Sequence, residues 1–360
     1  MPCHPYNRGH STVFSFTATA AMSSTSKKVL VPVANGSEPI EAVITIDVLR
    51  RSGADVTVAS VEKQLRVDAC HGVKIVADSL VSDCRDAVFD LIALPGGMPG
   101  ATNLKESEVL ESIVKKQASD GHLNAAICAS PAVVLGSWGL LKGLKQTVES
   151  RVQQDGKVVT SRGPGTTMEF AVALVEQLYG KEKADEVSGP LVMRANHGDE
   201  YTIAEFNPIQ WTFDNSPQIL VPIANGSEEM EAVIIIDILR KCCGCGGLGG
   251  AQAFAKSEKL VNMLKKQKES NRPYGAICAS PALVLEPHGL LKGKKATAFP
   301  AMCNKLSDQS EIENRVVVDG NLITSRGPGT SMEFALAIVE KFFGRNKALE
   351  LAKILLLSCT

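Results

Sequence analysis

The sequence predicts an α/β fold, in which a parallel sheet is covered by helices on both faces, and it predicts this fold twice in tandem. Two observations carry the prediction. Short apolar, β-branched runs alternate with segments of helical periodicity, and three blocks of sequence occur twice along the chain. With 360 residues, of which 44% are hydrophobic and 21% charged, the chain is long enough to form two domains with substantial cores.

The duplicated blocks identify a tandem repeat with a different piece missing from each copy. The blocks are Val31–Glu38 and Val221–Glu228, Ala126–Pro131 and Ala276–Pro281, and Thr160–Thr166 and Thr324–Thr330. The offset falls from 190 residues (31 to 221) to 150 (126 to 276), so the second copy is 40 residues shorter between these blocks. The offset then rises to 164 (160 to 324), so the first copy is 14 residues shorter farther on.

The first repeat reads as alternating strands and helices. Strands are predicted at 29–34, 55–60, 89–94, 124–127 and 158–161, and helices at 40–51, at about 106–117, from 130 onward, and from 166 to about 178. Ser37, before acidic Glu38 and Pro39, is the predicted N-cap of the first helix. Thr166 and Glu169 form a predicted capping box at the start of the last.

The domain organisation follows from these repeats. We expect repeat one at 28–193, a linker at 194–217 and a truncated repeat two at 218–360. Residues 1–27 contain no Asp or Glu and are rich in Ser, Thr and Ala. Such a leader is typical of an organelle transit peptide, here toward the chloroplast. A disordered tail, or a start at Met22 with the protein in the cytoplasm and nucleus, is the alternative interpretation.

Composition excludes several classes of function. The net charge is −1, which gives no indication of the basic surface that binds nucleic acid. No apolar run approaches the ~20 residues that span a bilayer, so we expect neither a nucleic-acid nor a membrane partner. Ten cysteines in 360 residues are too few for a disulfide scaffold, which favours a reduced protein.

Cys128 and Cys278 are the candidate nucleophiles. Each follows a predicted strand and precedes Ala-Ser-Pro and a predicted helix. A sulfur at such a turn lies near the positive end of the helix, which favours a thiolate, and in the crevice where parallel sheets bind ligands. An inert buried cysteine is the alternative, and the position of the residue argues against it.

Glu41 and Glu231 are the candidate proton-transfer groups. Each occurs in the first turns of a predicted helix, within the repeated pattern Asn-Gly-Ser-Glu-x-x-Glu. One interpretation is that these acids only complement the helix dipole. The other is that a carboxyl turned inward beside a thiolate is desolvated, stays protonated and moves protons.

Glycine pairs supply candidate backbone donors. Gly96 and Gly97 follow a predicted strand, and Gly246 and Gly247 stand at the matching place in repeat two. Amides at such turns can approach a substrate oxygen closely, as can those of Ala129 and Ala279 after the cysteines. The sulfurs of 242–245 have no fourth ligand nearby and no histidines have metal-ligand spacing, so we expect no metal.

Taken in order, these motifs resemble the DJ-1/PfpI family, and the tandem arrangement is similar to that of the plant DJ-1 homologues. The motifs are Asn-Gly-Ser-Glu-x-x-Glu, Leu-Pro-Gly-Gly, Ala-Ile-Cys-Ala-Ser-Pro and Thr-Ser-Arg-Gly-Pro-Gly-Thr. The resemblance implies a flavodoxin-like sandwich, a nucleophile-elbow cysteine at Cys128 and Cys278, and acidic partners at Glu41 and Glu231. It also implies that the amides of Gly97, Ala129, Gly247 and Ala279 act as oxyanion donors.

The resemblance further implies a function. Similar proteins convert methylglyoxal or glyoxal to lactate or glycolate without glutathione or any cofactor, and deglycase roles are ascribed to the family. We therefore expect a small 2-oxoaldehyde as substrate. A non-catalytic redox sensor or stress-protective holdase is the second hypothesis, and a cysteine hydrolase or amidotransferase the third.

The chain departs from the family pattern near the cysteine. Many members carry a histidine in a segment like Ala-Thr-Thr-His-Pro, where repeat two has Phe299 before Pro300 and repeat one has lost the segment. Repeat one, with its Gly pair, Glu41 and Cys128, is the predicted active half. We expect the repeats to pair within the chain, with repeat two the less stable, and a further homo-oligomer remains open.

Overall fold

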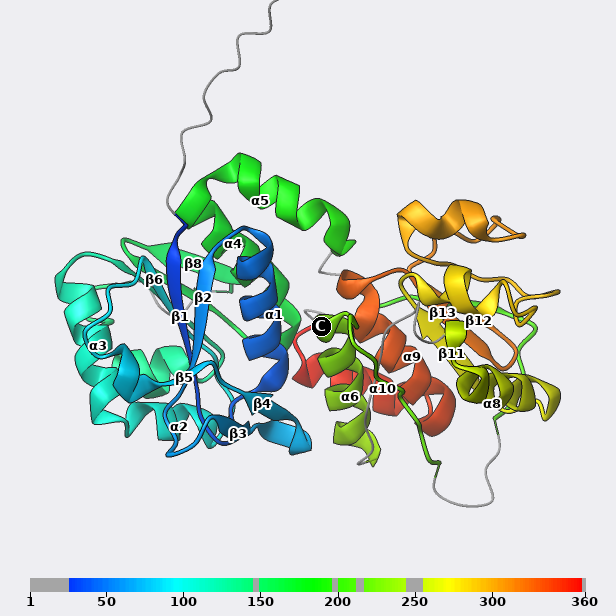
Figure 1. Ribbon diagram of the computed structural model, residues 1–360, viewed down its shortest axis with the longest axis horizontal. Coiled ribbons are helices and arrows are strands. Elements are labelled where there is room, and N and C mark those ends of the chain that lie inside the picture. The colour runs from blue at the N-terminus through cyan, green and yellow to red at the C-terminus, as the bar shows by residue number, and fades with distance from the viewer. Residues whose placement is uncertain (1–25, 145–148, 196–199, 212–216, 244–254, 358–360) are drawn as a thin grey trace, which may run out of the picture.

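The computed structural model describes residues 26–144, 149–195, 200–211, 217–243 and 255–357, which form two α/β units side by side. Repeat one runs from blue to green and repeat two from yellow-green to red in Figure 1. The predicted leader lies almost wholly outside the described residues. Within those residues, no helix combines the length and the apolar character needed to cross a membrane.

Repeat one is built on a seven-stranded sheet of order β5-β2-β1-β6-β7-β9-β8, parallel except for the β8–β9 hairpin. The strands are β1 (Lys28–Val33), β2 (Asp55–Ser60), β5 (Ser79–Leu80), β6 (Leu91–Leu94), β7 (Leu123–Ile127), β8 (Val152–Asp155) and β9 (Val158–Ser161). A separate hairpin joins β3 (Arg66–Asp68) to β4 (Lys74–Val76). The helices are α1 (Pro39–Arg51), α2 (Gly100–Lys105), α3 (Glu108–Ser119), α4 (Thr167–Tyr179) and α5 (Lys181–Ser188).

Alternation along β1 explains why both faces of this sheet are covered. Val29, Val31 and Val33 belong to a hydrophobic cluster with α1 and α4, whereas Leu30 belongs to a second cluster with α2 and α3. Successive side chains of a strand point to opposite faces, so an unbroken apolar run produces a sheet buried on both sides. The α/β class and the expected strands of repeat one are confirmed.

The predicted N-cap of α1 is wrong, and the predicted capping box of α4 does not form, although Thr166 is the N-cap residue of that helix. The N-cap of α1 is Glu38, whose Oε1 accepts the Ile40 N–H at 3.4 Å, while Ser37 Oγ instead accepts the Ala34 N–H at 3.0 Å. Thr166 makes no side-chain cap to α4, because its hydroxyl is occupied by the turn that precedes the helix. The predicted helix from 130 onward is a π-helical segment, Pro131–Gly136.

The described part of repeat two holds four strands, in the order β10-β12-β13-β11. They are β10 (Ala204–Phe206), β11 (Tyr274–Ile277), β12 (Val316–Asp319) and β13 (Leu322–Ser325). The described helices of this half are α6 (Glu229–Cys243), α8 (Glu258–Glu269), α9 (Ser331–Phe343) and α10 (Arg345–Ile354). Residues 217–224, the counterpart of β1, form no strand, and Leu220 and Ile223 are exposed.

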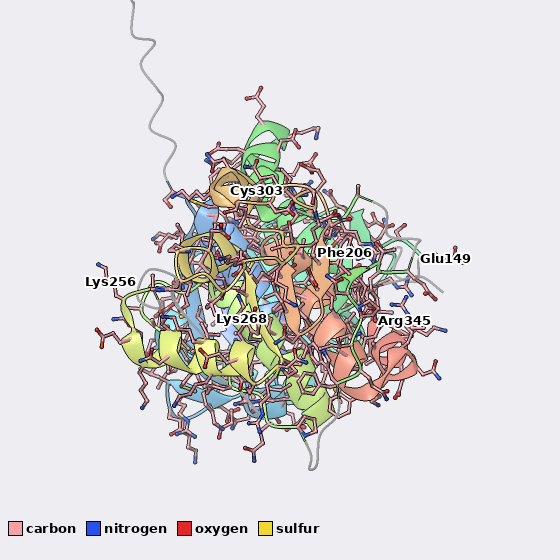
Figure 2. The ribbon with its side chains drawn as sticks, turned by 90° about the vertical axis from the view of Figure 1, so that its right-hand side faces the viewer. Glu149, Phe206, Lys256, Lys268, Cys303 and Arg345 are labelled. Atoms are coloured by element: carbon pink, nitrogen blue, oxygen red, sulfur yellow. The ribbon has the colours of Figure 1, made fainter. Side chains whose placement is uncertain are left out.

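The missing first strand follows from the 40-residue loss. In repeat one, β1 is held between β2 and β6. The counterparts of these two neighbours fall in the stretch that repeat two lacks, so among the described residues 217–224 have no strand on either side to bond to. Instead β10, from the segment expected to be only a linker, pairs in parallel with β12 (Figure 2 labels Phe206 on it).

The two repeats pair about matching helices. α1 and α6 pack side by side at the centre of the molecule (Figure 1), and residues of both belong to one continuous hydrophobic cluster. The segment after α5 of repeat one packs against repeat two, where Arg315 donates to the Val192 carbonyl at 2.9 Å. In the same way, the segment after α10 of repeat two packs against repeat one, where Arg151 donates to the Leu356 carbonyl at 3.1 Å. Each half therefore completes the other.

Because the core is shared, weakening α6 is expected to destabilise repeat one as well. Ile234 is fully buried in the common cluster, so Ile234→Ala should lower the free energy of unfolding by about 2–5 kcal/mol. The two tryptophans report on different halves: Trp138 is buried in repeat one, and Trp211 packs edge-on against Phe342 of α9. Single-tryptophan chains made with Trp138→Phe or Trp211→Phe should show the same loss in denaturant titrations. A Trp138 transition unmoved by Ile234→Ala would contradict a shared core.

Candidate functional site

Both candidate nucleophiles lie on a strained turn at the carboxyl end of a strand. Cys128 follows β7 with φ of 61°, and Cys278 follows β11 with φ of 63°. Non-glycine residues rarely adopt this left-handed conformation, which costs of order 1 kcal/mol or more. Each turn is held by the cysteine N–H, which donates to the carbonyl of Ser161 at 3.0 Å or of Ser325 at 3.1 Å on the next strand.

Glu41 is a fully buried carboxyl in the first turn of α1. Its Oε2 accepts the Gly96 N–H at 2.8 Å, and its Oε1 has no hydrogen-bond partner among the described residues. The carboxyl also interacts with the Cys128 thiol. Burial raises the pKa of Glu41 to about 8, and the negative charge of Glu38 adds to the effect. The carboxyl is therefore mainly protonated at neutral pH, as predicted for an acid turned inward beside sulfur.

The expected low pKa of the thiol is wrong. Loss of water around the sulfur and, next, the negative charge of Glu41 raise the pKa of Cys128 to about 12, although the residue as a whole is exposed. The backbone N–H groups of Gly97 and Ala129 bond to the sulfur and lower its pKa, but they do not outweigh burial. Only a short π-helical segment follows the cysteine, so little helix dipole acts on it.

The predicted backbone donors divide into two roles. The amides of Gly97 and Ala129 reach the Cys128 sulfur, so they lie where an oxyanion formed next to that sulfur would be. Gly96 is different, because its N–H is already bonded to Glu41. Glycine is required at both positions: a Cβ on Gly96 would lie 2.7 Å from the Cβ of Cys128, and Gly97 has φ of +87°.

The second site repeats part of this arrangement. Glu231 is buried and its pKa is raised by burial to about 8, with its carboxyl bonded to the Cys278 thiol. Burial raises the pKa of Cys278 as well, and the Ala279 amide opposes the shift. The other two predicted donors, Gly246 and Gly247, lie outside the described residues.

The sequence analysis did not predict the ion pairs that join the two repeats. Lys241 of α6 lies 2.8 Å from Asp237 Oδ2 on its own helix and 3.6 Å from Glu38 Oε2 of repeat one. Arg51 of α1 lies 2.6 Å from Asp47 and 2.5 Å from Glu228 of repeat two. The signal was present, since these residues differ by the same offset of 190 as the duplicated block.

Side chains of these ion pairs belong to two groups whose members are possible metal ligands. The groups are Glu38 with His71 and Asp237, and Asp47 with Glu228 and Glu229. In each group a basic side chain already lies among the carboxylates, Lys241 in the first and Arg51 in the second. The positive charge beside these buried acids thus comes from the side chains of Lys241 and Arg51.

A residue of repeat two also lies close to the first site. A Cβ on Gly163 would lie 3.1 Å from Leu356 Cδ1 and 4.0 Å from Glu41 Oε1, so the side chain of Leu356 and the Glu41 carboxyl both approach this glycine. The Gly165 N–H donates to the Leu355 carbonyl at 2.6 Å, which fixes the crossing segment. The repeated Ser-Arg-Gly-Pro-Gly-Thr turn therefore holds a segment of repeat two against repeat one.

Comparison with known proteins agrees with this geometry. The model of the "DJ-1/PfpI family" matches residues 27–149 and 245–341. "Protein DJ-1 homolog B" of Arabidopsis thaliana is 64% identical over 394 aligned positions, covering 94% of this chain and 90% of the relative. That alignment is longer than the chain's 360 residues, so the relative has segments that this chain lacks.

Two further likenesses cover about half of the chain. A glutathione-independent glyoxalase of Caenorhabditis elegans is 35% identical over 44% of this chain and 91% of its own length. The solved structure of oxidised Toxoplasma gondii DJ-1 is 47% identical over 46% of this chain and 97% of its own, with a TM-score of 0.45. The extent of the first relative and of the family match settles the assignment: this chain belongs to the DJ-1/PfpI family.

Proposed function

We propose that the protein is a glutathione-independent glyoxalase that converts 2-oxoaldehydes such as methylglyoxal to 2-hydroxy acids at Cys128. One observation carries the proposal: a thiol on a strained turn touches both a buried, protonated carboxyl and two backbone amides. The thiol is the nucleophile, and both the proton-carrying carboxyl and the oxyanion donors contact it directly. The name of the Caenorhabditis elegans relative supports the same activity.

The proposed reaction begins when the Cys128 sulfur adds to the aldehyde carbon. The thiol proton passes to ionised Glu41 and from there to the former aldehyde oxygen, which gives a hemithioacetal. The amides of Gly97 and Ala129 stabilise the negative charge on that oxygen during the addition. The carboxylate of Glu41 is then free again.

The same carboxylate then carries out the isomerisation. Glu41 removes the proton from the former aldehyde carbon and returns it to the neighbouring ketone carbon, while the hydroxyl proton of the hemithioacetal passes to the ketone oxygen. The first carbon is oxidised to a thioester and the second is reduced to an alcohol, so no external oxidant or reductant enters. Water hydrolyses the thioester, which releases the 2-hydroxy acid and restores the thiol. From methylglyoxal the product is lactate.

The pH dependence of this reaction follows from the raised pKa of Glu41. Below about pH 8 both groups of the Cys128–Glu41 pair hold their protons, and one proton must be lost before the carboxylate can act. We therefore expect log(kcat/KM) for methylglyoxal to rise with a slope near one from pH 6 toward about 8 and then to level.

The control for this profile is Glu41→Gln, which should remove the rise at about pH 8 from whatever activity is left. A wild-type rate that is constant between pH 6 and 8 would show that the carboxyl is ionised at neutral pH, against the burial seen here. Stopped assays of lactate avoid any pH effect on coupled enzymes.

A redox-sensing role is the second candidate, because Cys128 is exposed. Peroxide would oxidise the sulfur to a sulfinic acid, and the O–H of protonated Glu41 with the amides of Gly97 and Ala129 would bond to the product oxygens. Mass spectrometry after mild peroxide treatment separates the two functions. Selective oxidation of Cys128 in a chain that turns over no 2-oxoaldehyde would favour the sensor over the glyoxalase.

A further inference from the structure

We propose that repeat two holds a second binding site, a lysine-lined cavity at the opposite end of its sheet from Cys278, and that this cavity takes a small sugar phosphate or a similar hydroxylated phosphate ester. The site goes beyond the proposed function, because neither thiol and neither buried glutamate lines it. The cavity has a volume of about 550 Å³, which lies within the roughly 300–1,000 Å³ of ordinary small-molecule pockets.

The cavity lies at the amino end of β11, whereas Cys278 follows the carboxyl end of the same strand. Asp319, which lines the cavity, stands opposite Leu322 in the β12–β13 hairpin, and Leu322 in turn pairs with Tyr274, the first residue of β11. Cys278 is four residues farther along the chain (274 to 278), a rise of roughly 13 Å in a strand. The cavity is therefore separate from the thiol site.

Hydrogen bonds to the buried residue Asp319 fix one wall of the cavity. Its Oδ1 accepts a hydrogen bond from the Asn207 side chain at 2.8 Å, and its Oδ2 accepts the Lys295 N–H at 2.7 Å. The Asp319 carbonyl accepts a hydrogen bond from Lys294 Nζ at 3.0 Å. The loop that carries the lysines is thereby held against the hairpin, so the cavity is already formed without a ligand.

Three ammonium groups gather at this cavity. Lys292 and Lys294 line it, and Lys268 of α8, which Figure 2 labels, donates to the carbonyl of Gly289, another lining residue, at 2.8 Å. Burial and then the positive charges of Lys294 and Lys292 lower the pKa of Lys268. The three groups therefore repel one another, and an anion placed between them would relieve that repulsion.

The acidic residues that line the cavity do not cancel this positive charge. Asp319 and Asp308 each have a lysine partner, Lys294 at 3.7 Å and Lys295 at 2.8 Å. Among the described residues, the other two ammonium groups form no ion pair with a carboxylate. Two lysines thus remain against a single lining carboxylate, that of Glu286.

These groups together match a phosphate ester that also carries hydroxyl groups. In the proposed complex the phosphate, with about two negative charges, accepts hydrogen bonds from Lys268, Lys292 and Lys294. The sugar hydroxyls donate to the carboxylates of Asp308 and Glu286, each of which already accepts one backbone N–H. A carboxylate has about four acceptor positions, so both can accept a hydroxyl in addition.

The first test measures binding to the full chain by isothermal titration calorimetry, at low salt and in a buffer free of phosphate. Glucose 6-phosphate is the probe, and glucose and inorganic phosphate are tested beside it. We expect one molecule of the ester per chain, bound about tenfold more tightly than inorganic phosphate because its hydroxyls also bond to the walls. Sodium chloride should weaken binding, since salt screens the charges. No binding at millimolar ester, or equal affinity for phosphate and ester, would overturn the inference.

Variants of the lysines supply the matched controls. Lys268→Gln and Lys292→Gln should each weaken binding of glucose 6-phosphate by about tenfold, the scale of a hydrogen bond between charged groups. Lys259→Gln removes the same charge from an exposed position on α8, nine residues earlier (259 to 268) and on the opposite side of the helix. It should leave the affinity unchanged. Equal losses from all three variants would show that only the net charge of the chain matters, against a site in this cavity.

The second test locates the bound ester. Acetylation of lysines by an N-hydroxysuccinimide ester is followed by peptide mass spectrometry, with and without saturating glucose 6-phosphate. We expect slower acetylation at Lys268 and Lys292 and an unchanged rate at Lys259. Binding that protects neither of the first two lysines would place the ligand elsewhere and contradict the proposal. Neither test measures turnover of a 2-oxoaldehyde, so the outcome is independent of the proposed function.

Discussion

Replacing Cys128 with serine is expected to lower kcat/KM for methylglyoxal by about three orders of magnitude, the usual scale for loss of a covalent nucleophile. Cys278→Ser should leave more than half of the activity. The reason is that Cys128 has both of its amide donors, Gly97 and Ala129, on an intact seven-stranded sheet. Among the described residues Cys278 has only the donor at Ala279, on a sheet of four strands.

Cys278→Ser is the matched control for this comparison, because it makes the same atomic change at the equivalent turn. Lactate formation from methylglyoxal by the two variants, at equal concentration and after confirming equal melting temperatures, decides between the repeats. A Cys128→Ser chain that keeps most of its activity would show that repeat two is the active half.

Replacing Glu41 with glutamine is expected to lower kcat by about 10²- to 10⁴-fold, the range for loss of a positioned proton-transfer group. The amide preserves the shape of the side chain and can still accept the Gly96 N–H, so the fold should be kept. Glu231→Gln makes the same change in repeat two and should cost less than twofold. A large loss from Glu231→Gln with a small loss from Glu41→Gln would contradict the assignment.

Glu41→Gln is also expected to change how the stability of the protein depends on pH. The pKa of Glu41 is raised to about 8 in the folded state from 4.5, so the stability that its protonated form contributes is fully present below pH 4.5. That contribution is lost as pH rises through about 8, because the folded chain holds a proton that the unfolded chain releases. Glu41→Gln should therefore unfold with a weaker dependence on pH between 5 and 8 than the wild type, as measured by denaturant titration.

The fold of repeat one could be predicted because its signals are local and repeated. The run at 29–34 is apolar without interruption, and the sheet buries it on both faces. The caps were mispredicted because serine and threonine compete for several partners: Ser37 bonds back to Ala34, and Thr166 serves the turn before it. β10 could not be predicted, since three residues pair only because the edge of β12 is open to them.

The residues of the candidate site were predicted correctly, but the pKa expected for its thiol was wrong. The repeated blocks placed Cys128 and Glu41 near one another, and the structure brings them into contact. The sequence could not show how deeply each group is buried, and burial decides the direction of both pKa shifts. The helix that was expected to favour a thiolate is a short π-helical segment, a detail that depends on tertiary packing.

Contacts between the repeats could not be predicted one by one, because they depend on how two folded units meet. The hydrogen bond from Arg151 to the Leu356 carbonyl and the ion pair of Lys241 with Glu38 join residues more than 200 positions apart. Once the pairing of α1 with α6 is known, the offset of 190 relates the ion pair of Lys241 with Glu38 to its counterpart, the ion pair of Arg51 with Glu228.

The central claim is that the chain converts a 2-oxoaldehyde to a 2-hydroxy acid through its own thiol. The most direct measurement is lactate formed from methylglyoxal by the purified full chain, without glutathione or added metal, beside a chain carrying both Cys128→Ser and Cys278→Ser. We predict many molecules of lactate per wild-type chain and none above background from the double variant. Wild-type chains that consume methylglyoxal without releasing lactate, or equal lactate from both chains, would contradict the account.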